Sequence, residues 1–293
     1  MIIMKNFSLW NNDIEIQFFK EALENFASPE QLFYKLKAGY FAYIPKGDDS
    51  EGQTLQSRNS LIGKFTEKWC RNLLEPIAEK LNLFAINDVI CEEIGLTKKS
   101  SADVAFCKKD ALTQKAEDIK LLFEVKMSIV SNYKFDKLSN IIEPVGDYKN
   151  HKGNPSLLRS DSMLKAIGKS INIRVSGIQA TKIPIIILGN SPITDNYKNK
   201  VDFLRTSGVI QGFLSLNPKP VESNFIKNTE KFGFQTIDNV EQITKLVQKL
   251  LVEDLNYFSS MINKMDLGKI ISIAGKEMTD VLKAEKFLSL IRT

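Results

Sequence analysis

Two short runs in which apolar and charged positions alternate stand out in the middle of the chain. The first reads S-A-D-V-A-F over residues 101–106, and the second reads K-L-L-F-E-V-K over residues 120–126. Successive side chains of a strand point to opposite faces, so Asp103 faces away from the apolar side of its run, as Glu124 and Lys126 do in theirs. Unpaired charge is costly to bury in strands, and we therefore expect these residues to line a solvated site. The alternative is a Glu–Lys pair on an exposed edge strand and an unrelated Asp.

The pattern before these runs predicts mostly helices. Apolar residues at helical spacing predict an amphipathic helix over residues 13–27. Ser28 and Pro29 fit the start of a second helix that carries Leu32, Phe33 and Leu36. We then expect a short strand over 39–44, a polar loop over 45–60, a helix over 61–75 that Pro76 interrupts before it resumes over 77–81, and a strand over 85–95.

The pattern after the two runs predicts further helices and strands. A long irregular stretch covers 140–159, and Ser160 or Asp161 can cap the helix that follows. The apolar run over 182–189 is typical of a strand buried on both faces, and 209–216 predicts another strand. The order is then αβββαβ followed by αβ, which makes the fold class α/β. We expect one compact unit with a helical N-terminal segment and polar loop (1–60), a core (61–220) and a helical C-terminal region (221–293).

Composition is that of an ordinary soluble protein and permits several partners. The 293 residues are 43% hydrophobic and 26% charged, and the net charge of +5 with a pI near 8.9 is permissive for nucleic acid. Cys70, Cys91 and Cys107 are far apart, which favours reduced core thiols over disulfides. The start, M-I-I-M-K-N, has no signal-peptide core, and no stretch approaches the ~18 apolar residues of a membrane span. We expect a cytoplasmic protein with no membrane contact.

The absence of several motifs excludes other chemistries. His151 is the single histidine, which argues against a Ser-His-Asp triad and against a His-rich zinc site. The chain has no G-x-x-x-x-G-K-[ST] loop and no G-x-G-x-x-G motif. We therefore expect no nucleotide cofactor. Hydrolysis by carboxylates and a metal ion is the remaining route.

Asp103, Glu124 and Lys126 have the residue types for metal-assisted phosphodiester hydrolysis. Two carboxylates from neighbouring strands can hold Mg²⁺, which prefers oxygen ligands and keeps several waters. A lysine that reaches the same side can lower the pKa of the attacking water or stabilise the pentavalent phosphate.

The same residues resemble a known signature. Asp103, Glu124, Val125 and Lys126 match the D…(D/E)-x-K pattern of the PD-(D/E)xK nuclease superfamily, although Ala102 stands where the nominal Pro would precede the Asp. The resemblance covers residues 61–216 and implies a restriction-endonuclease-like core (αβββαβ, a mixed sheet flanked by helices) with helical N- and C-terminal additions. It also implies that Asp103, Glu124 and the carbonyl of Val125 bind Mg²⁺.

A further carboxylate near the metal is implied by the same resemblance. The helix before the catalytic strands often supplies a Glu in this superfamily, and Glu67 is the matching position here. The alternative for Glu67 is a surface pair with Lys64 or Arg71. Glu92 and Glu93 follow the strand before Asp103 and are other candidates, although a water-facing strand end is the simpler interpretation for both.

Two irregular stretches and one helix carry candidate DNA contacts. Arg58 and Asn59 lie in the polar loop 45–60, where the alternative is a solvated linker. The stretch 140–159 supplies the candidates Lys149, Lys152 and Arg159 together with His151; the alternative is an ordinary surface loop with His151 exposed. Lys165, Lys169 and Arg174 on the following helix could meet phosphate.

Together these features predict a type II restriction endonuclease, a Mg²⁺-dependent enzyme that cuts double-stranded DNA at a short specific sequence. Cutting both strands of a palindrome calls for two-fold symmetry, so a homodimer is expected. One alternative is a structure-specific or repair nuclease with the same site, which needs mainly phosphate contacts. Another is a non-catalytic DNA-binding protein whose D…E-x-K match is accidental.

Overall fold

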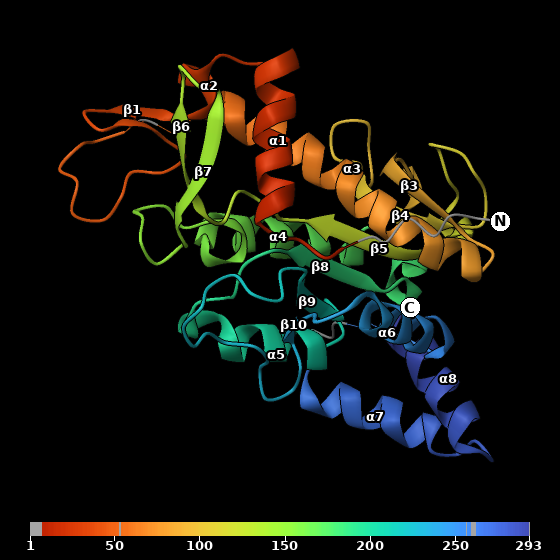
Figure 1. Cartoon of the computed structure of the whole chain (residues 1–293). Helices are drawn as coiled ribbons and strands as arrows, with labels where there is room; N and C mark the ends of the chain where they lie inside the picture. The colour runs from red at the N-terminus through yellow and green to blue at the C-terminus, as the bar shows by residue number, and fades with distance from the viewer. Residues whose placement is uncertain (1–7, 53, 256, 259–261, 293) are drawn as a thin grey trace.

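The chain folds around a central mixed sheet with a second, smaller sheet beside it (Figure 1). The structure is a computed structural model that describes residues 8–52, 54–255, 257–258 and 262–292. The opening residues 1–6, in which we expected no signal peptide, lie outside the described residues.

The central sheet has six strands in the order β10-β9-β8-β5-β4-β3. Strands β3, β4 and β5 pair antiparallel, whereas β5, β8, β9 and β10 pair parallel. All five residues of β8 are buried, as its run of Ile and Leu predicts for a central parallel strand. The strands are β3 (Phe84–Val89), β4 (Ala102–Cys107), β5 (Ile119–Val125), β8 (Ile185–Gly189), β9 (Gly212–Ser215) and β10 (Phe234–Thr236).

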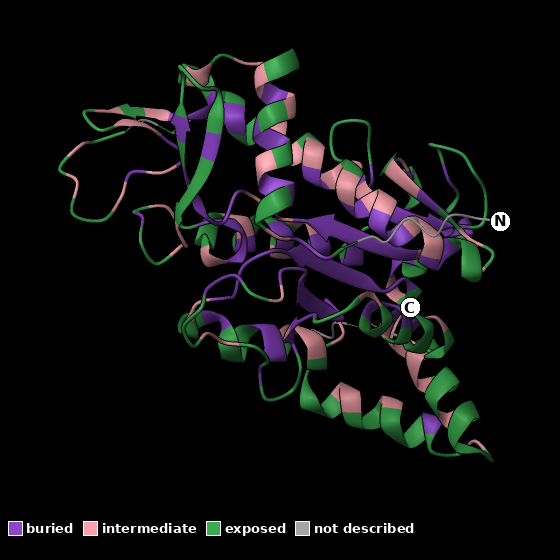
Figure 2. Cartoon of the chain, viewed as in Figure 1, coloured by how far each residue is buried: buried purple, intermediate pink, exposed green. Residues whose placement is uncertain are grey.

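Helices cover both faces of this sheet and bury its strands (Figure 2). Helices α3 (Gln56–Lys80) and α6 (Val240–Val252) share one hydrophobic core with the face that carries Phe106 and Phe123. Helices α4 (Ser160–Val175) and α5 (Lys198–Thr206) share the other core with the face that carries Ala105 and Leu122. The predicted α/β class with a mixed sheet between helices is confirmed.

The second sheet was missed in the sequence. It is antiparallel, in the order β1-β2-β6-β7, with β1 (Tyr34–Leu36), β2 (Gly39–Phe41), β6 (Asn132–Asp136) and β7 (Ile141–Gly146). The predicted second helix is only one turn, α2 (Pro29–Leu32), since the chain is extended from Phe33 onward. Phe33 stacks between Phe19 and Phe135, so aromatic packing against the sheet outweighs the local helical spacing. The stretch 140–159 is likewise not wholly irregular, because β7 lies within it.

Helix α1 (Asn12–Asn25) joins the second sheet to the core through a buried carboxyl. Glu15 accepts hydrogen bonds from Trp10 Nε1 (2.8 Å), the Val130 and Ser131 amides (2.7 and 3.1 Å) and Tyr133 Oη (2.9 Å). Burial nevertheless raises the pKa of Glu15 to about 7, because removal from water penalises the charged form more than these donors favour it.

Helix α3 differs from its prediction at both ends. It begins at Gln56, so Arg58 and Asn59 belong to the helix and not to a loop. It also continues through Pro76 to Lys80, although proline removes one hydrogen bond. The buried side chains of Leu73, Leu74 and Ile77 flank Pro76 and hold this turn on the sheet.

The element order α3-β3-β4-β5-α4-β8 follows the predicted αβββαβ, with the β6–β7 hairpin inserted before α4. The predicted strand 85–95 ends at Val89, and a short 3-10 turn follows it. The region expected to be helical from 221 onward is irregular apart from β10 until α6 begins at Val240, and α7 (Lys264–Ala274) and α8 (Asp280–Ile291) form a hairpin that extends from the body (Figure 1). The 3-10 turns are Glu92–Ile94, Ala116–Asp118, Ser156–Leu158, Ile178–Lys182 and Asp195–Tyr197.

Two further expectations concern cysteines and membranes. Cys70, Cys91 and Cys107 are all buried and free, as predicted for core thiols. Within the described part of the chain, no helix combines the length and the apolar character needed to cross a bilayer.

Candidate active site

Two adjacent strands bring Asp103 and Glu124 together. The antiparallel register pairs Val104 of β4 with Phe123 of β5, so Asp103, one residue before Val104, lies beside Glu124, one residue after Phe123. Side chains at opposed positions point to the same face, and here that face is the one covered by α4. The alternation of the two sequence runs therefore predicted the correct side for both carboxylates.

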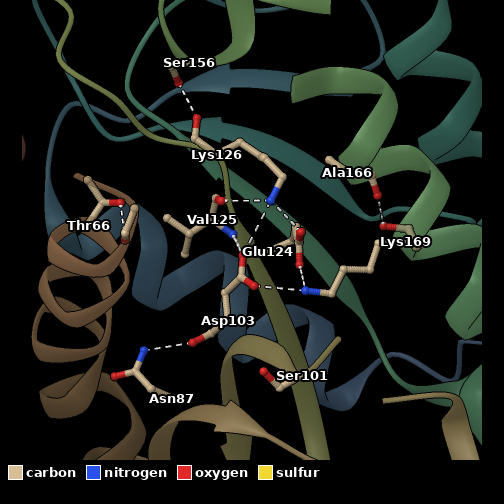
Figure 3. Close-up of polar contacts among 12 residues, drawn as sticks. Thr66, Asn87, Ser101, Asp103, Glu124, Val125, Lys126, Ser156, Ala166 and Lys169 are labelled. Carbon is tan, nitrogen blue, oxygen red and sulfur yellow. Dashed lines mark hydrogen bonds and ion pairs between the residues drawn. The ribbon is translucent and has the colours of Figure 1, made fainter. Parts of the chain in front are cut away.

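Lys126 extends from the end of β5 into the same group (Figure 3). Its Nζ lies 2.5 Å from Glu124 Oε1, 3.7 Å from Asp103 Oδ2 and 3.0 Å from the carbonyl oxygen of Val125. The Lys126 amide donates to the Leu188 carbonyl on β8 (2.7 Å), which fixes the backbone from which the side chain leaves.

Lys169 of helix α4 completes the group, and the sequence reasoning assigned it no part there. Its Nζ lies 2.9 Å from Asp103 Oδ1 and 2.5 Å from Glu124 Oε2. Figure 3 shows the two lysines approaching the carboxylates from different elements. One signal was available in the sequence: the small residues Ala166 and Ser170 flank Lys169 on the buried stripe of α4, which indicates a close approach of this helix to the sheet.

Burial and mutual charge perturb this group. Burial, followed by the neighbouring charge of Asp103, raises the pKa of Glu124. Burial alone would lower the pKa of Lys169, but the Asp103 and Glu124 carboxylates outweigh it, so the pKa of Lys169 is raised. Two carboxylates and two ammonium groups thus form one compact ion-pair network.

The oxygens of this group fit a hard divalent cation. Across the described ranges of the chain, no cluster of three or more His, Cys, Asp and Glu side chains is placed to hold a metal ion. The oxygens here that could hold such a cation are those of the Asp103 and Glu124 carboxylates and of the Val125 carbonyl. Mg²⁺ is usually held by only one or two carboxylates and keeps several waters, so this set suits it. The Val125 amide donates to Asp103 Oδ2 (2.7 Å), which fixes the orientation of that carboxylate.

Glu67 lies near the group without a direct hydrogen bond to it. Asn87 Nδ2 donates to the backbone carbonyls of both Glu67 (3.1 Å) and Asp103 (2.8 Å), and so ties α3 to β4. Burial, and next the negative charge of Asp103, raises the pKa of Glu67 to about 7. Glu93 accepts from the Ala116 amide (2.7 Å) and Glu92 is exposed, so neither points to the group. The role of Glu67 stays a prediction.

A second layer of hydrogen bonds holds the end of β5 in place. Ser156 Oγ donates to the carbonyl of Lys126 (2.5 Å) and accepts from the amide of Asn190 (3.0 Å). Asn190 Nδ2 in turn donates to the Ser128 carbonyl (2.6 Å). Gly189 permits this approach, because a Cβ there would come within 2.4 Å of Leu157. The position of Lys126 is therefore set by the backbone of three segments.

A groove of about 1020 Å³ leads to the site from the side of the second sheet. The side chains that line it include Lys126, Asn59, Lys152, Arg159 and Lys165. The last four were predicted as DNA contacts and all are exposed. Arg159 and Lys165 both pair with Asp161 (3.6 and 3.0 Å), which also lines the groove. The structure thus gathers predicted contacts from α3, the loop before α4 and α4 itself along one path.

Arg58 differs from the loop residue that we expected. Although it borders the groove, it is only 4% exposed, and its Nη1 donates to the carbonyls of Leu32 and Ala42. Its guanidinium lies 4.8 Å from the ring centre of Tyr43 and 5.6 Å from that of Tyr34. These contacts give Arg58 a structural role, since they connect α3 to the second sheet.

Two more basic residues are buried, and a third, Lys149, is exposed and contacts another loop. His151 is buried: it stacks on Tyr43 at 4.0 Å and bonds through Nε2 with the Val130 carbonyl. Lys149 Nζ donates to Ser223 Oγ (2.7 Å) and the Asn224 carbonyl. Arg174 is also buried, and its guanidinium donates to backbone carbonyls between α4 and the strands. Its acceptors are the carbonyls of Val209, Ala180 and Ile183 and the side-chain oxygen of Gln211.

Comparisons of this chain with protein-family models, with curated proteins and with solved structures found no match. The site is therefore interpreted from its own geometry.

Proposed function

We propose that this protein is a Mg²⁺-dependent endonuclease of the type II restriction class, which hydrolyses phosphodiester bonds of double-stranded DNA at a short sequence. The observation that carries the proposal is the adjacency of Asp103 and Glu124 on paired strands, with Lys126 Nζ 2.5 Å from Glu124 Oε1. The predicted resemblance to the PD-(D/E)xK superfamily is supported by the α3-β3-β4-β5-α4-β8 order around these residues. The proposed fold is accordingly the restriction-endonuclease-like core.

Each polar residue has a definite part in the proposed reaction. Asp103, Glu124 and the Val125 carbonyl would hold Mg²⁺, which supplies charge neutralisation at phosphate and a more acidic water. Lys126, held between Glu124 Oε1 and the Val125 carbonyl, would present its ammonium to the reacting phosphate as a hydrogen-bond donor. The Val125 amide keeps Asp103 in its orientation.

The groove offers a path for the DNA. Asn59, Lys152, Arg159 and Lys165 contribute an amide and three cations to its walls, and Lys126 connects it to the site. Cations along a groove attract the phosphate backbone, and Asn and Arg side chains also read base edges. A homodimer would place two such sites on a two-fold axis, as cutting of both strands requires.

Two other functions compete with this one. A structure-specific or repair nuclease would use the same site with mainly phosphate contacts. A DNA-binding protein without catalysis would use the groove alone.

Incubation of the purified protein with long duplex DNA, with Mg²⁺ or with EDTA, separates the three. Discrete fragments formed only with Mg²⁺ would support the restriction enzyme, and their ends would give the recognition site. A smear, or cutting of branched DNA alone, would favour the repair nuclease. Binding without cutting would favour the non-catalytic protein.

A matched pair of variants assigns the activity to the site. Asp103→Asn removes a proposed metal ligand and should abolish cutting. Asp110→Asn makes the same change at an exposed carboxylate in the loop after β4 and should leave cutting unchanged. Equal activity of both variants would overturn the assignment.

A further inference from the structure

Lys169 occupies the position between the carboxylates that a shared cation would take. Its Nζ contacts Asp103 Oδ1 at 2.9 Å and Glu124 Oε2 at 2.5 Å, so a single ammonium group bridges the pair. The other oxygens have other partners: Asp103 Oδ2 accepts from the Val125 amide, and Glu124 Oε1 accepts from Lys126. The two oxygens that Lys169 covers are thus the ones left to bind a cation jointly (Figure 3).

We propose that Lys169 is an internal counter-cation that a divalent metal ion displaces when it binds Asp103 and Glu124. This inference rests on the proposed function, because it takes the carboxylate pair as the metal site. Before metal binds, the Lys169 ammonium compensates two carboxylates that burial and mutual repulsion would otherwise destabilise. After metal binds, the ammonium is free to contact a phosphate oxygen of the substrate.

The place of Lys169 in the fold permits this movement. A lysine ammonium is a compact charge on a flexible stem of four carbons, and the Lys169 side chain is 18% exposed. Lys165, one turn earlier on α4, already lines the groove with a side chain that is 70% exposed. Rotation of the Lys169 stem toward Lys165 would therefore carry its charge from the carboxylates toward the DNA path.

Lys126 is not the residue displaced in this scheme. It contacts Glu124 Oε1 and the Val125 carbonyl, and its backbone is anchored through Ser156 and Leu188. Lys169 lies in the middle of α4, and only its long side chain reaches the carboxylates. Its ammonium group is therefore farther from a fixed backbone than that of Lys126 is. The two lysines therefore have different roles: Lys126 remains in place, and Lys169 is displaced by the metal ion.

Calorimetric titration of Mn²⁺ and Mg²⁺ into the DNA-free protein tests the proposal without measuring cutting. Lys169→Met removes the competing charge and should lower the Kd of the metal about tenfold, in the range of ordinary coupling between two ligands. Lys165→Met is the matched control on the same helix and should leave the Kd within about twofold of wild type. An unchanged Kd in Lys169→Met would overturn the proposal.

A measurement on the wild-type protein covers the case in which Lys169→Met does not fold. The side-chain ammonium of a lysine held in a salt bridge gives a nitrogen NMR signal, which Lys169→Arg would identify by its loss. Saturating Mg²⁺ should move or remove this signal and leave that of Lys165 in place. A Lys169 signal unchanged by bound Mg²⁺ would contradict displacement.

These results separate the inference from the function on which it rests. If the protein binds metal and cuts DNA only with metal, but the metal Kd is the same in wild type and Lys169→Met, the nuclease proposal is supported and the counter-cation proposal is refuted. A wild-type protein and a Lys169→Met variant that both bind no divalent metal would refute the metal site itself, and with it both proposals.

Discussion

Arg58 connects helix α3 to the second sheet, and its replacement distinguishes a structural residue from a DNA contact. The guanidinium is 4% exposed, and one nitrogen donates to the carbonyls of Leu32 and Ala42. Arg58→Met keeps much of the apolar stem and removes the charge and both hydrogen bonds. The two carbonyls would then be buried without this donor.

The expected loss of stability follows from these contacts. A hydrogen bond to a charged group contributes about 1.5–3 kcal/mol. Because a single nitrogen serves both carbonyls, we take the lower figure for each, which gives about 3 kcal/mol for the pair. The rings of Tyr43 and Tyr34 beside the guanidinium add about 0.5–1 kcal/mol of cation–π attraction. The free energy of unfolding should therefore fall by about 3.5–4 kcal/mol.

Urea unfolding followed by tryptophan fluorescence measures this loss. The chain has two tryptophans, and Trp10 is buried with its ring centre 5.2 Å from that of Trp69, so both report on the core under α3. With a slope of about 2–3 kcal/mol per molar urea, the midpoint should fall by about 1 M or more. Asn59→Ala, at the exposed neighbouring position, should change the free energy by no more than about 0.5 kcal/mol.

Measurement of DNA binding tests the alternative, that Arg58 contacts DNA directly. An Arg58→Met protein that unfolds at the wild-type urea concentration but binds duplex DNA several-fold more weakly would refute the structural role. Arg58 would then be the direct contact that its place in a polar stretch of sequence suggested. Asn59→Ala should keep the wild-type stability and bind DNA more weakly, the opposite of the result expected for Arg58→Met.

Three other outcomes follow from single features of the structure. Lys126→Met should slow cutting by about 10²–10³-fold, as for loss of one charge-stabilising donor, while calorimetry should still detect metal binding. The native pKa of Glu15, about 7, lies above the ordinary value of 4.5. Its contribution to the free energy of unfolding is therefore complete below pH 4.5 and falls by about 3 kcal/mol as the pH rises to 7. Urea unfolding across this range should show that decline in wild type and a flatter profile in Glu15→Gln. Met278→Lys with Val281→Lys, on the exposed apolar surface of the α7–α8 hairpin, should weaken the expected homodimer in sedimentation velocity.

The strands and the carboxylate pair could be predicted from sequence because their signals are local. Alternation within residues 101–106 and 120–126 sets the face of each side chain, and an antiparallel pair then brings Asp103 beside Glu124. The apolar run that became β8 is equally local, since it needs no partner to be recognised. These features depend only on the backbone period.

The features that sequence reasoning missed all depend on contacts between distant segments. The second sheet pairs β2 with β6, about ninety residues apart along the chain, so the strand expected over 39–44 gave no sign of its partner. Phe33 became extended because Phe19 and Phe135 stack on it from elsewhere. Arg58, His151 and Arg174 looked like surface cations, yet each is buried against backbone carbonyls.

The face from which each residue approaches explains the charge balance of the site. Asp103, Glu124 and Lys169 meet on the side of the sheet covered by α4, whereas Glu67 belongs to α3, which covers the opposite side. The charge of Asp103 therefore raises the pKa of Glu67 across the strand, although Glu67 makes no direct contact with the two carboxylates. The charged groups that touch both carboxylates are Lys126 from the end of β5 and Lys169 from α4. With both lysines counted, the two carboxylates and two ammonium groups carry no net charge before metal binds, so the site can be buried at low cost and still exchange one ammonium for Mg²⁺.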